Sequence, residues 1–201
     1  MSELQKWEER FSAPGYWFGT TPNAFLASQA QRLRRGQTAL SIADGEGRNG
    51  VWLARQGLDV LSLDFSPAAG AKARALAAEH GVQLRTELAD VTTWNWPAAQ
   101  FDVIVAIFIQ FVGPDLRRRM FEGMKQALKP AGWLFLQGYR PEQLNYRTGG
   151  PDKVENLYTR AILEAAFGDL AVVEINEHDS VIREGRGHNG MSALIDLAAQ
   201  K

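Results

Sequence analysis

Apolar and polar positions change period along this chain in a way that predicts alternating strands and helices. From residue 39 onward, short apolar runs alternate with stretches whose apolar residues recur at helical spacing. The apolar runs predict strands at 39–43, 58–65, 82–90, 101–111, 133–139, 170–178 and 191–198. Because strands that alternate with helices form βαβ units, the pattern predicts an α/β fold with a mainly parallel sheet.

Local signals mark where some elements begin and end. Ser66 followed by Pro67 is typical of a helix N-terminus, and the Ala-rich stretch 67–80 predicts the helix itself. Gly81 then supplies the residue that commonly follows a helix. The segment 140–156 is polar and rich in turn formers, which predicts a long loop over the site.

Composition and charge exclude several classes of protein. Hydrophobic residues make up 45% and charged residues 22% of 201 residues, which fits a globular domain and not a disordered chain. There is no cysteine, so a disulfide scaffold, a thiol nucleophile and a cysteine metal site are excluded. We expect no metal site.

The formal net charge of −1 provides no global field for nucleic acid, although arginines cluster at 32–35 and 117–119. The charged start and the absence of a long apolar run predict a cytoplasmic protein without a membrane span.

The most informative segment is ALSIADGEGRNG at 39–50. A glycine-rich turn between a first strand and a first helix lets the backbone approach a ligand and points helix N–H groups at it. Asp64 ends the second predicted strand 19 residues after Gly45, where a carboxylate can accept both ribose hydroxyls. These features favour an adenosine ligand, but a flavin or nicotinamide cofactor remains an alternative at this point.

A third acidic position separates these alternatives. Asp90 and Val91 follow the third predicted strand, where a carboxylate can reach the amino group of an adenine, and Phe101-Asp102 opens the fourth strand. Acids after strands two and three, followed by such a fourth strand, resemble the pattern of class I S-adenosylmethionine-dependent methyltransferases. The segments YWFGTTPNAFL (16–26) and GEGRN (45–49) are similar to those of the tellurite-resistance and thiopurine methyltransferase-like group.

The resemblance covers nearly the whole chain and implies a three-layer, Rossmann-like, seven-stranded sheet, mainly parallel with an antiparallel last strand. The order of elements along the chain predicts one domain overall, with residues 1–38 as an N-terminal helical cap and 39–201 as the Rossmann-like methyltransferase domain. The resemblance implies S-adenosyl-L-methionine as cofactor. The implied cofactor-binding residues are Phe18, Asp44, Gly45, Gly47, Asn49, Asp64, Phe65, Asp90, Val91 and Ile107.

Two positions depart from the family pattern. Ser41 stands where a first-strand acid is usual, and Ala43 stands where the first glycine of the turn is usual. We expect Asp44 to replace part of the missing carboxylate near the sulfonium or the methionine amino group. If it does not, the affinity for the cofactor is in question.

The acceptor side is less well marked. The segment AIFIQF (106–111) lacks the Asn/Asp-Pro-Pro-aromatic motif of methyltransferases acting on adenine or glutamine amino groups, which favours a small-molecule acceptor. A thiol or chalcogen oxyanion would need no strong base. His188, in a polar turn before the last strand, is a candidate base or a turn-stabilising residue.

Arg140 and Tyr139 leave the fifth strand at its ligand-binding end, where Arg140 would hold an anionic acceptor or form a structural ion pair. His80 and His178 are secondary candidates.

Three other functions stay open. The chain could bind S-adenosylmethionine without efficient catalysis, as the altered first strand suggests, or methylate RNA or protein through its arginine clusters. A nicotinamide dehydrogenase is disfavoured by the acid at position 90. We expect a small-molecule acceptor as partner, no nucleic acid, and a monomer or homodimer.

Overall fold

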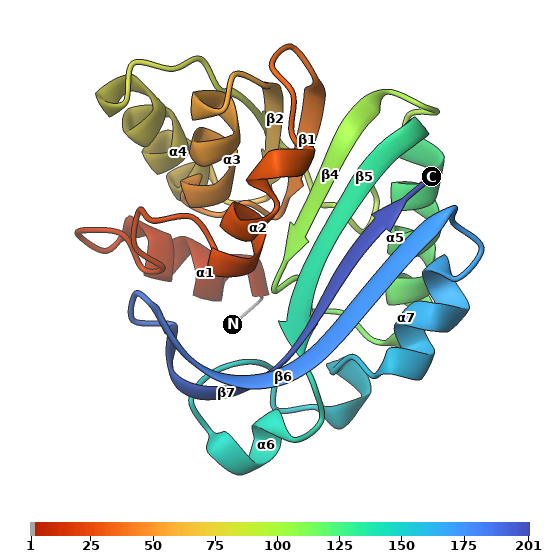
Figure 1. Ribbon diagram of the computed structural model, residues 1–201. Helices are drawn as coiled ribbons and strands as arrows, with labels where there is room; N and C mark the ends of the chain where they lie inside the picture. The colour runs from red at the N-terminus through yellow and green to blue at the C-terminus, as the bar shows by residue number, and fades with distance from the viewer. Residues whose placement is uncertain (1–2) are drawn as a thin grey trace. The chain divides into compact units, whose positions relative to one another are not determined.

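A computed structural model describes residues 3–201 and contains a seven-stranded sheet with the strand order β3-β2-β1-β4-β5-β7-β6 (Figure 1). The strands are β1 Thr38–Ile42, β2 Asp59–Asp64, β3 Arg85–Leu88, β4 Phe101–Ile107, β5 Leu128–Tyr139, β6 Val172–Glu184 and β7 His188–Gln200. The α-helices are α1 Glu3–Ser12, α2 Ala24–Ser28, α3 Arg48–Arg55, α4 Pro67–Glu79, α5 Pro114–Ala127, α6 Gln143–Tyr146 and α7 Arg160–Phe167. Two 3₁₀ turns, η1 Ala30–Arg32 and η2 Val154–Asn156, complete the secondary structure.

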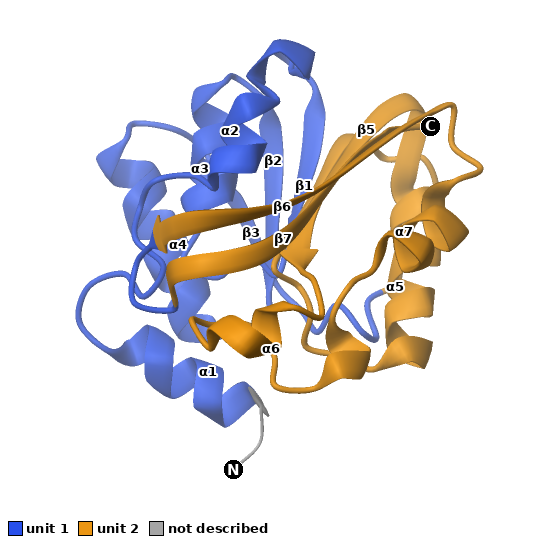
Figure 2. Ribbon diagram, turned by 60° about the horizontal axis from the view of Figure 1, so that its bottom comes forward, with its two compact units in different colours: residues 1–94, 184–187 blue, residues 95–183, 188–201 orange. Residues whose placement is uncertain are grey.

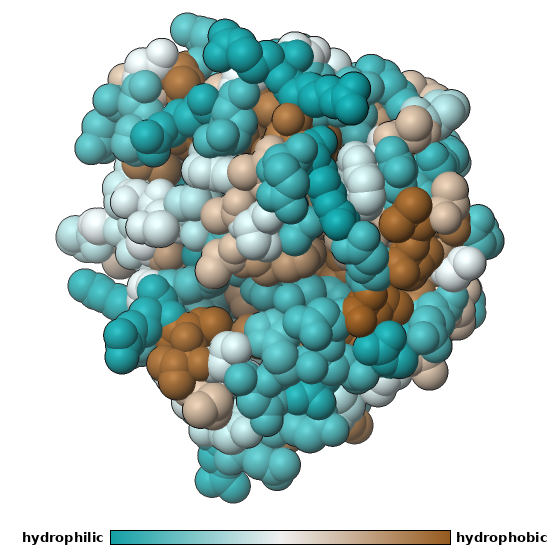
Figure 3. Space-filling model, in the orientation of Figure 1, coloured by the Kyte–Doolittle hydropathy of each residue, from teal (hydrophilic) through white to brown (hydrophobic). Residues whose placement is uncertain are grey.

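The predicted fold class is confirmed. β1 pairs with β2, β2 with β3, and β4 with β5, all in parallel, whereas the last strand β7 pairs antiparallel with β5. Within residues 3–201, no helix is long and apolar enough to cross a membrane. In the space-filling view, apolar side chains form small separate patches among polar ones on the face shown (Figure 3).

The chain divides into two compact units (Figure 2). Unit 1 comprises residues 1–94 and 184–187, and unit 2 comprises 95–183 and 188–201. This division does not follow the predicted boundary between residues 38 and 39. The predictions that residues 1–38 form an N-terminal cap and that the chain is one domain overall both stay predictions.

Unit 1 contains strands β1, β2 and β3 with helices α3 and α4 packed on them and α1 packed on α4. β1 is buried on both faces apart from its first residue, as expected of a parallel strand covered by helices. The predicted start of α4 is confirmed, because the Ser66 hydroxyl accepts the Ala69 N–H and Pro67 is the first helical residue. Gly81 follows the helix with a φ of +65°, a conformation that favours glycine.

Unit 2 contains strands β4, β5, β7 and β6, with α5 and α7 packed against each other and against β5 and β7 respectively. Phe121 of α5 packs against Phe167 of α7, with ring centroids 4.9 Å apart, and against Tyr158, at 5.7 Å. All three rings are almost fully buried. This aromatic cluster forms the apolar core on that side of the unit.

Several predicted boundaries in unit 2 were wrong. β4 ends at Ile107 and not at residue 111, because Phe108 adopts a φ of +55° that a strand cannot contain. β6 and β7 extend to residues 184 and 188, so the predicted polar turn shortens and His188 becomes the first residue of β7. The predicted loop 140–156 contains two short helical turns.

Candidate cofactor and acceptor sites

The glycine-rich turn in unit 1 follows β1 and leads into α3. Ala43, Gly45 and Gly47 all have positive φ angles, of 46°, 59° and 88°. Gly47 is the N-cap of α3, and a Cβ placed there would lie 2.6 Å from the Cβ of Ala73 on α4. Position 47 therefore requires glycine both for its left-handed backbone and for the close packing of α4.

Asp64 ties the turn to the end of β2. Its Oδ2 accepts the Gly45 N–H at 2.8 Å, and its Oδ1 accepts the Ser66 N–H at 2.9 Å. Its side chain is buried, and this burial raises the pKa of the carboxyl against the opposing effect of these hydrogen bonds. The Asp64 carbonyl accepts the Ala89 N–H at 3.0 Å. The ends of β1, β2 and β3 are therefore hydrogen-bonded neighbours.

Asp90 lies beside this arrangement, one residue after Ala89. Its carboxylate is exposed, and Oδ1 accepts both the N–H of Thr92, at 2.9 Å, and its hydroxyl, at 2.7 Å. Val91 is buried and Phe65 is half-buried. Unit 1 thus places the turn backbone, the Asp64 carboxylate and the start of the Asp90 loop at adjacent strand ends, a donor and acceptor set that fits a nucleoside.

Asp44 has partners that the sequence did not reveal. Its side chain is buried, and its carboxylate accepts the Ser41 hydroxyl at 2.7 Å, the Ser62 hydroxyl at 2.8 Å and the Gly50 N–H at 3.2 Å. Burial raises its pKa to about 6. These contacts make Asp44 a brace between β1, β2 and the first turn of α3. A role towards the cofactor amino group stays a prediction.

The polar side chains of the turn bind neighbouring segments of unit 1. The Glu46 carboxylate accepts the Trp17 N–H at 2.6 Å and the Phe18 N–H at 3.4 Å, and it forms an ion pair with Lys72 at 2.8 Å. Glu46 is buried. The segment that carries Phe18, an implied cofactor-binding residue, is therefore hydrogen-bonded directly to the glycine-rich turn.

A second set of contacts links the same turn to residues 184–187. Arg48 forms an ion pair with Glu184 at 2.6 Å, and both side chains are at most 10% exposed. The Asn49 Oδ1 accepts the Asn23 N–H at 2.9 Å, and the Asn23 Nδ2 donates to Glu184 Oε1 at 2.9 Å. The sequence analysis assigned Asn49 to the cofactor and did not predict these contacts, although both segments that the Asn23–Asn49 hydrogen bond joins, 16–26 and 45–49, were recognised as motifs.

Unit 2 brings two of the acceptor-side candidates, Tyr139 and His188, into contact with Phe108. The Phe108 ring stacks on Tyr139 with centroids 4.7 Å apart and lies 4.3 Å from the His188 ring. Tyr139 and His188 are both buried. A bulky residue in the left-handed region costs about 1–3 kcal/mol, and such strain clusters at functional sites. The strained Phe108 and its two ring neighbours are therefore a candidate acceptor contact.

Gln110 and Arg140 are occupied by structural bonds. Gln110 donates to the carbonyls of Tyr139 and Asn156 at 2.9 and 3.1 Å and accepts the Tyr139 N–H at 2.6 Å. Arg140 donates to the Leu194 carbonyl at 3.1 Å and forms ion pairs with Asp179 and with Glu142. These carboxylates already balance the Arg140 charge, so its role towards an anionic acceptor stays a prediction.

A buried carboxylate of β7 organises a polar network that sequence reasoning missed. Asp196 Oδ1 accepts the Gln137 Nε2–H at 2.6 Å, and Oδ2 lies 3.0 Å from the Nε2 of His178. The His178 Nδ1 lies 2.8 Å from the Ser180 hydroxyl. Only the pairing of β5, β6 and β7 brings these residues together. Among residues 3–201, no cluster of three or more His, Asp or Glu side chains is placed to hold a metal ion.

Part of the chain is similar to known methyltransferases. Residues 39–132 match the model of a methyltransferase domain. Over 112 residues the chain is 33% identical to protein-L-isoaspartate O-methyltransferase of Methylorubrum extorquens (strain PA1), covering 55% of this chain and 46% of that protein. The chain thus spans under half the length of this curated relative.

Solved structures share the fold. TehB from Haemophilus influenzae superposes with a TM-score of 0.73 and 16% identity, covering 98% of this chain and 66% of that one. The N-methyltransferase NodS from Bradyrhizobium japonicum WM9, in complex with S-adenosyl-L-homocysteine, superposes with a TM-score of 0.71 and 15% identity, covering 98% and 97%. The shared architecture is Rossmann-like.

Proposed function

We propose that this chain, which carries a methyltransferase domain of the Rossmann-like class at residues 39–132, transfers a methyl group from S-adenosylmethionine to a small-molecule acceptor. One observation carries the proposal: the turn at Gly45, the Asp64 carboxylate and the start of the Asp90 loop are linked by hydrogen bonds at the ends of three adjacent parallel strands. Ligands of open α/β sheets bind at this edge.

The residues of unit 1 fit the parts of the cofactor. Asp64 would accept the ribose hydroxyls, because each carboxylate oxygen can accept more than the one backbone N–H that it binds here. Asp90 would accept from the adenine amino group, and Phe65 and Val91 would contact the adenine ring. When bound, the cofactor supplies an activated methyl group on a sulfonium.

For the acceptor, Phe108, Tyr139 and His188 of unit 2 supply aromatic surface with one ring that can exchange a proton. Gln110 is used by the backbone, and the motif of amino-group methyltransferases is missing around it. These features support a small molecule such as a thiol or a chalcogen oxyanion, as the resemblance to the tellurite-resistance and thiopurine group implies.

A second candidate is a protein that binds S-adenosylmethionine without efficient turnover. The contacts of Asp44 favour it, because its carboxylate already accepts hydrogen bonds from Ser41 of β1, Ser62 of β2 and Gly50 of α3. In that case Asp44 does not replace the first-strand acid that is usual in the family at the position of Ser41.

Calorimetry with S-adenosylmethionine, S-adenosylhomocysteine and NAD tests the cofactor assignment. Asp64→Asn should weaken binding of the first two by about 1.5–3 kcal/mol, the value of a hydrogen bond to a charged group. Asp59→Asn is the matched control, because Asp59 lies at the opposite end of β2 in an exposed ion pair with Arg85. Equal effects of the two variants, or binding of NAD alone, would refute the proposal.

Release of S-adenosylhomocysteine in a panel of thiols, selenite and tellurite then separates the two candidates. Tight cofactor binding without turnover in any arm would favour the second one.

A further inference from the structure

The glycine-rich turn of unit 1 is covered by other segments of the same unit. Residues 44–50 are all buried. The Phe11 ring of α1 lies against Gly45, since a Cβ added to that glycine would be 3.4 Å from the ring. The proposed function therefore places the cofactor beneath segments that cover the turn.

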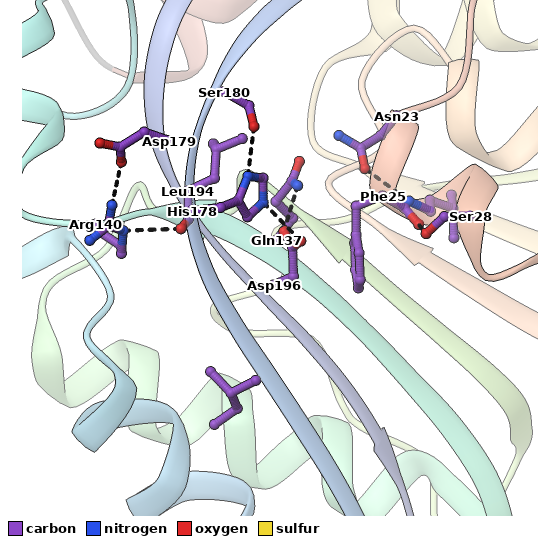
Figure 4. Close-up of polar contacts among 12 residues, drawn as sticks. Asn23, Phe25, Ser28, Gln137, Arg140, His178, Asp179, Ser180, Leu194 and Asp196 are labelled. Atoms are coloured by element: carbon purple, nitrogen blue, oxygen red, sulfur yellow. Dashed lines mark hydrogen bonds and ion pairs between the residues drawn. The ribbon is translucent and has the colours of Figure 1, made fainter.

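One of these segments, the strap, comprises residues 13–19 and lies between two anchored helices. Before it, Glu8 of α1 accepts the Ser66 hydroxyl at 2.5 Å, at the start of α4. After it, Asn23 caps α2 (Figure 4), where its Oδ1 accepts the Leu26 N–H at 3.0 Å. The strap is therefore a loop whose two ends are fixed within unit 1.

Glu46 holds the middle of the strap by its backbone. Its carboxylate is 3% exposed, and Oε2 accepts the Trp17 N–H at 2.6 Å and the Phe18 N–H at 3.4 Å. Hydrogen bonds to an ionised acceptor are about twice as strong as those between neutral groups. Because Glu46 is the middle residue of the Gly-x-Gly sequence, one side chain joins the turn to the strap.

Lys72 of α4 completes this arrangement. Its Nζ pairs with Glu46 Oε1 at 2.8 Å and donates to the carbonyls of Ala13 and Gly15, at 2.7 and 2.5 Å. An ammonium group has three donors, so Lys72 uses all of them on Glu46 and the strap. On the other side of the strap, the Trp17 carbonyl accepts the N–H of residue 186 at 2.7 Å. Opening of the strap would break all these contacts.

We propose that Glu46 and Lys72 are positioning residues for the cofactor: together they latch the strap over the glycine-rich turn, and opening of this latch limits how fast S-adenosylmethionine enters and leaves. The proposal rests on the proposed function. It deepens that function by assigning cofactor exchange to two side chains that act through the strap.

The latch predicts a kinetic behaviour that differs from that of a cofactor contact. If the strap is closed most of the time with and without cofactor, the association and dissociation rate constants both scale with the fraction of time that it is open. A weaker latch then raises both rate constants by the same factor and leaves Kd unchanged. Loss of a contact to the cofactor would instead raise the dissociation rate constant and weaken binding.

Stopped-flow binding of S-adenosylhomocysteine, followed by tryptophan fluorescence, measures both rate constants. Glu46→Gln keeps an oxygen for the Trp17 N–H but loses the charge opposite Lys72, and Lys72→Met removes the donors to the strap. Each variant should raise both rate constants at least about tenfold, with an unchanged Kd. Asp59→Asn is the control, because it removes a carboxylate from an exposed ion pair with Arg85 in the same unit, and it should change neither rate constant.

Hydrogen exchange of backbone amides tests the latch without cofactor. In Glu46→Gln the Trp17 and Phe18 amides should exchange at least about tenfold faster, because the open strap releases them. The amide of Leu40, which is buried within β1, should keep its wild-type rate. Equal acceleration at Leu40 would report a general loss of stability and would overturn the latch.

The two proposals fail in different ways. A raised dissociation rate constant with an unchanged association rate constant, or unchanged exchange at Trp17, would overturn the latch and leave the cofactor assignment intact. If the wild-type protein binds neither S-adenosylmethionine nor S-adenosylhomocysteine, the proposed function fails, and the role of the latch in cofactor exchange fails with it. The exchange data then still decide whether Glu46 holds the strap.

Discussion

Replacement of Asp44 by asparagine should remove a large part of the pH dependence of folding. Asp44 is buried beneath the glycine-rich turn, and this burial raises the pKa of its carboxyl from 3.8 to about 6, although Ser41, Ser62 and Gly50 donate hydrogen bonds to it. The unfolded chain has no such burial, so its carboxyl ionises near the ordinary value.

The direction of the effect is set by proton uptake. Between about pH 4 and pH 6 the folded protein keeps a proton on Asp44 that the unfolded chain has released. The free energy of unfolding therefore falls as pH rises through this window and is constant with respect to Asp44 above it. The pKa of Asp44 differs by about two units between the folded and unfolded states, and each unit corresponds to about 1.4 kcal/mol, so the total change in the free energy of unfolding is about 3 kcal/mol. Burial acts in the same direction on Asp64 and Asp196.

An asparagine side chain in place of Asp44 can keep hydrogen bonds without the charge, because its oxygen can accept the Gly50 N–H while its amide donates to the Ser62 hydroxyl. In urea unfolding, the free energy of unfolding of the wild-type protein should fall by about 3 kcal/mol relative to that of Asp44→Asn as the pH rises from 4 to 7.5. Asp59→Asn, in an exposed ion pair, should follow the wild-type curve. Parallel curves for Asp44→Asn and the wild-type protein would show that burial of Asp44 does not control its ionisation.

Three further changes probe the turn and the acceptor side. Gly47→Ala should destabilise the fold by about 1–2 kcal/mol through its left-handed backbone, and by more because the new Cβ would collide with Ala73. An unchanged melting temperature in thermal unfolding would contradict the packing described. Arg48→Met should lower the free energy of unfolding by about 3–5 kcal/mol, because it leaves the Glu184 carboxylate buried without its cation. The double variant with Glu184→Gln should recover part of this loss of stability in thermal unfolding, whereas an exposed ion pair would show no such recovery. His188→Ala should lower turnover at unchanged affinity for S-adenosylmethionine, and normal turnover would make this histidine structural.

The sequence by itself determined the order of elements and the positions of Asp64 and Asp90 at the ends of strands. Buried parallel strands are continuous apolar runs, and the end of each run places the following acid at one edge of the sheet, as Asp64 and Asp90 show. The start of α4 was equally local, because the Ser66 hydroxyl bonds to a backbone N–H three residues away.

Tertiary structure alone decided which polar side chains meet. Glu46, Arg48 and Asn49 point from the turn to segments 26 to 136 residues distant in sequence, and nothing local distinguishes such contacts from a ligand site. The pairing of His178 with Asp196 depends in the same way on strands whose register no short sequence pattern records. In a sheet, a side chain contacts mainly the residues directly opposite or diagonal to it on the neighbouring strand. Its partner is therefore set by the pairing of strands and not by its neighbours along the chain.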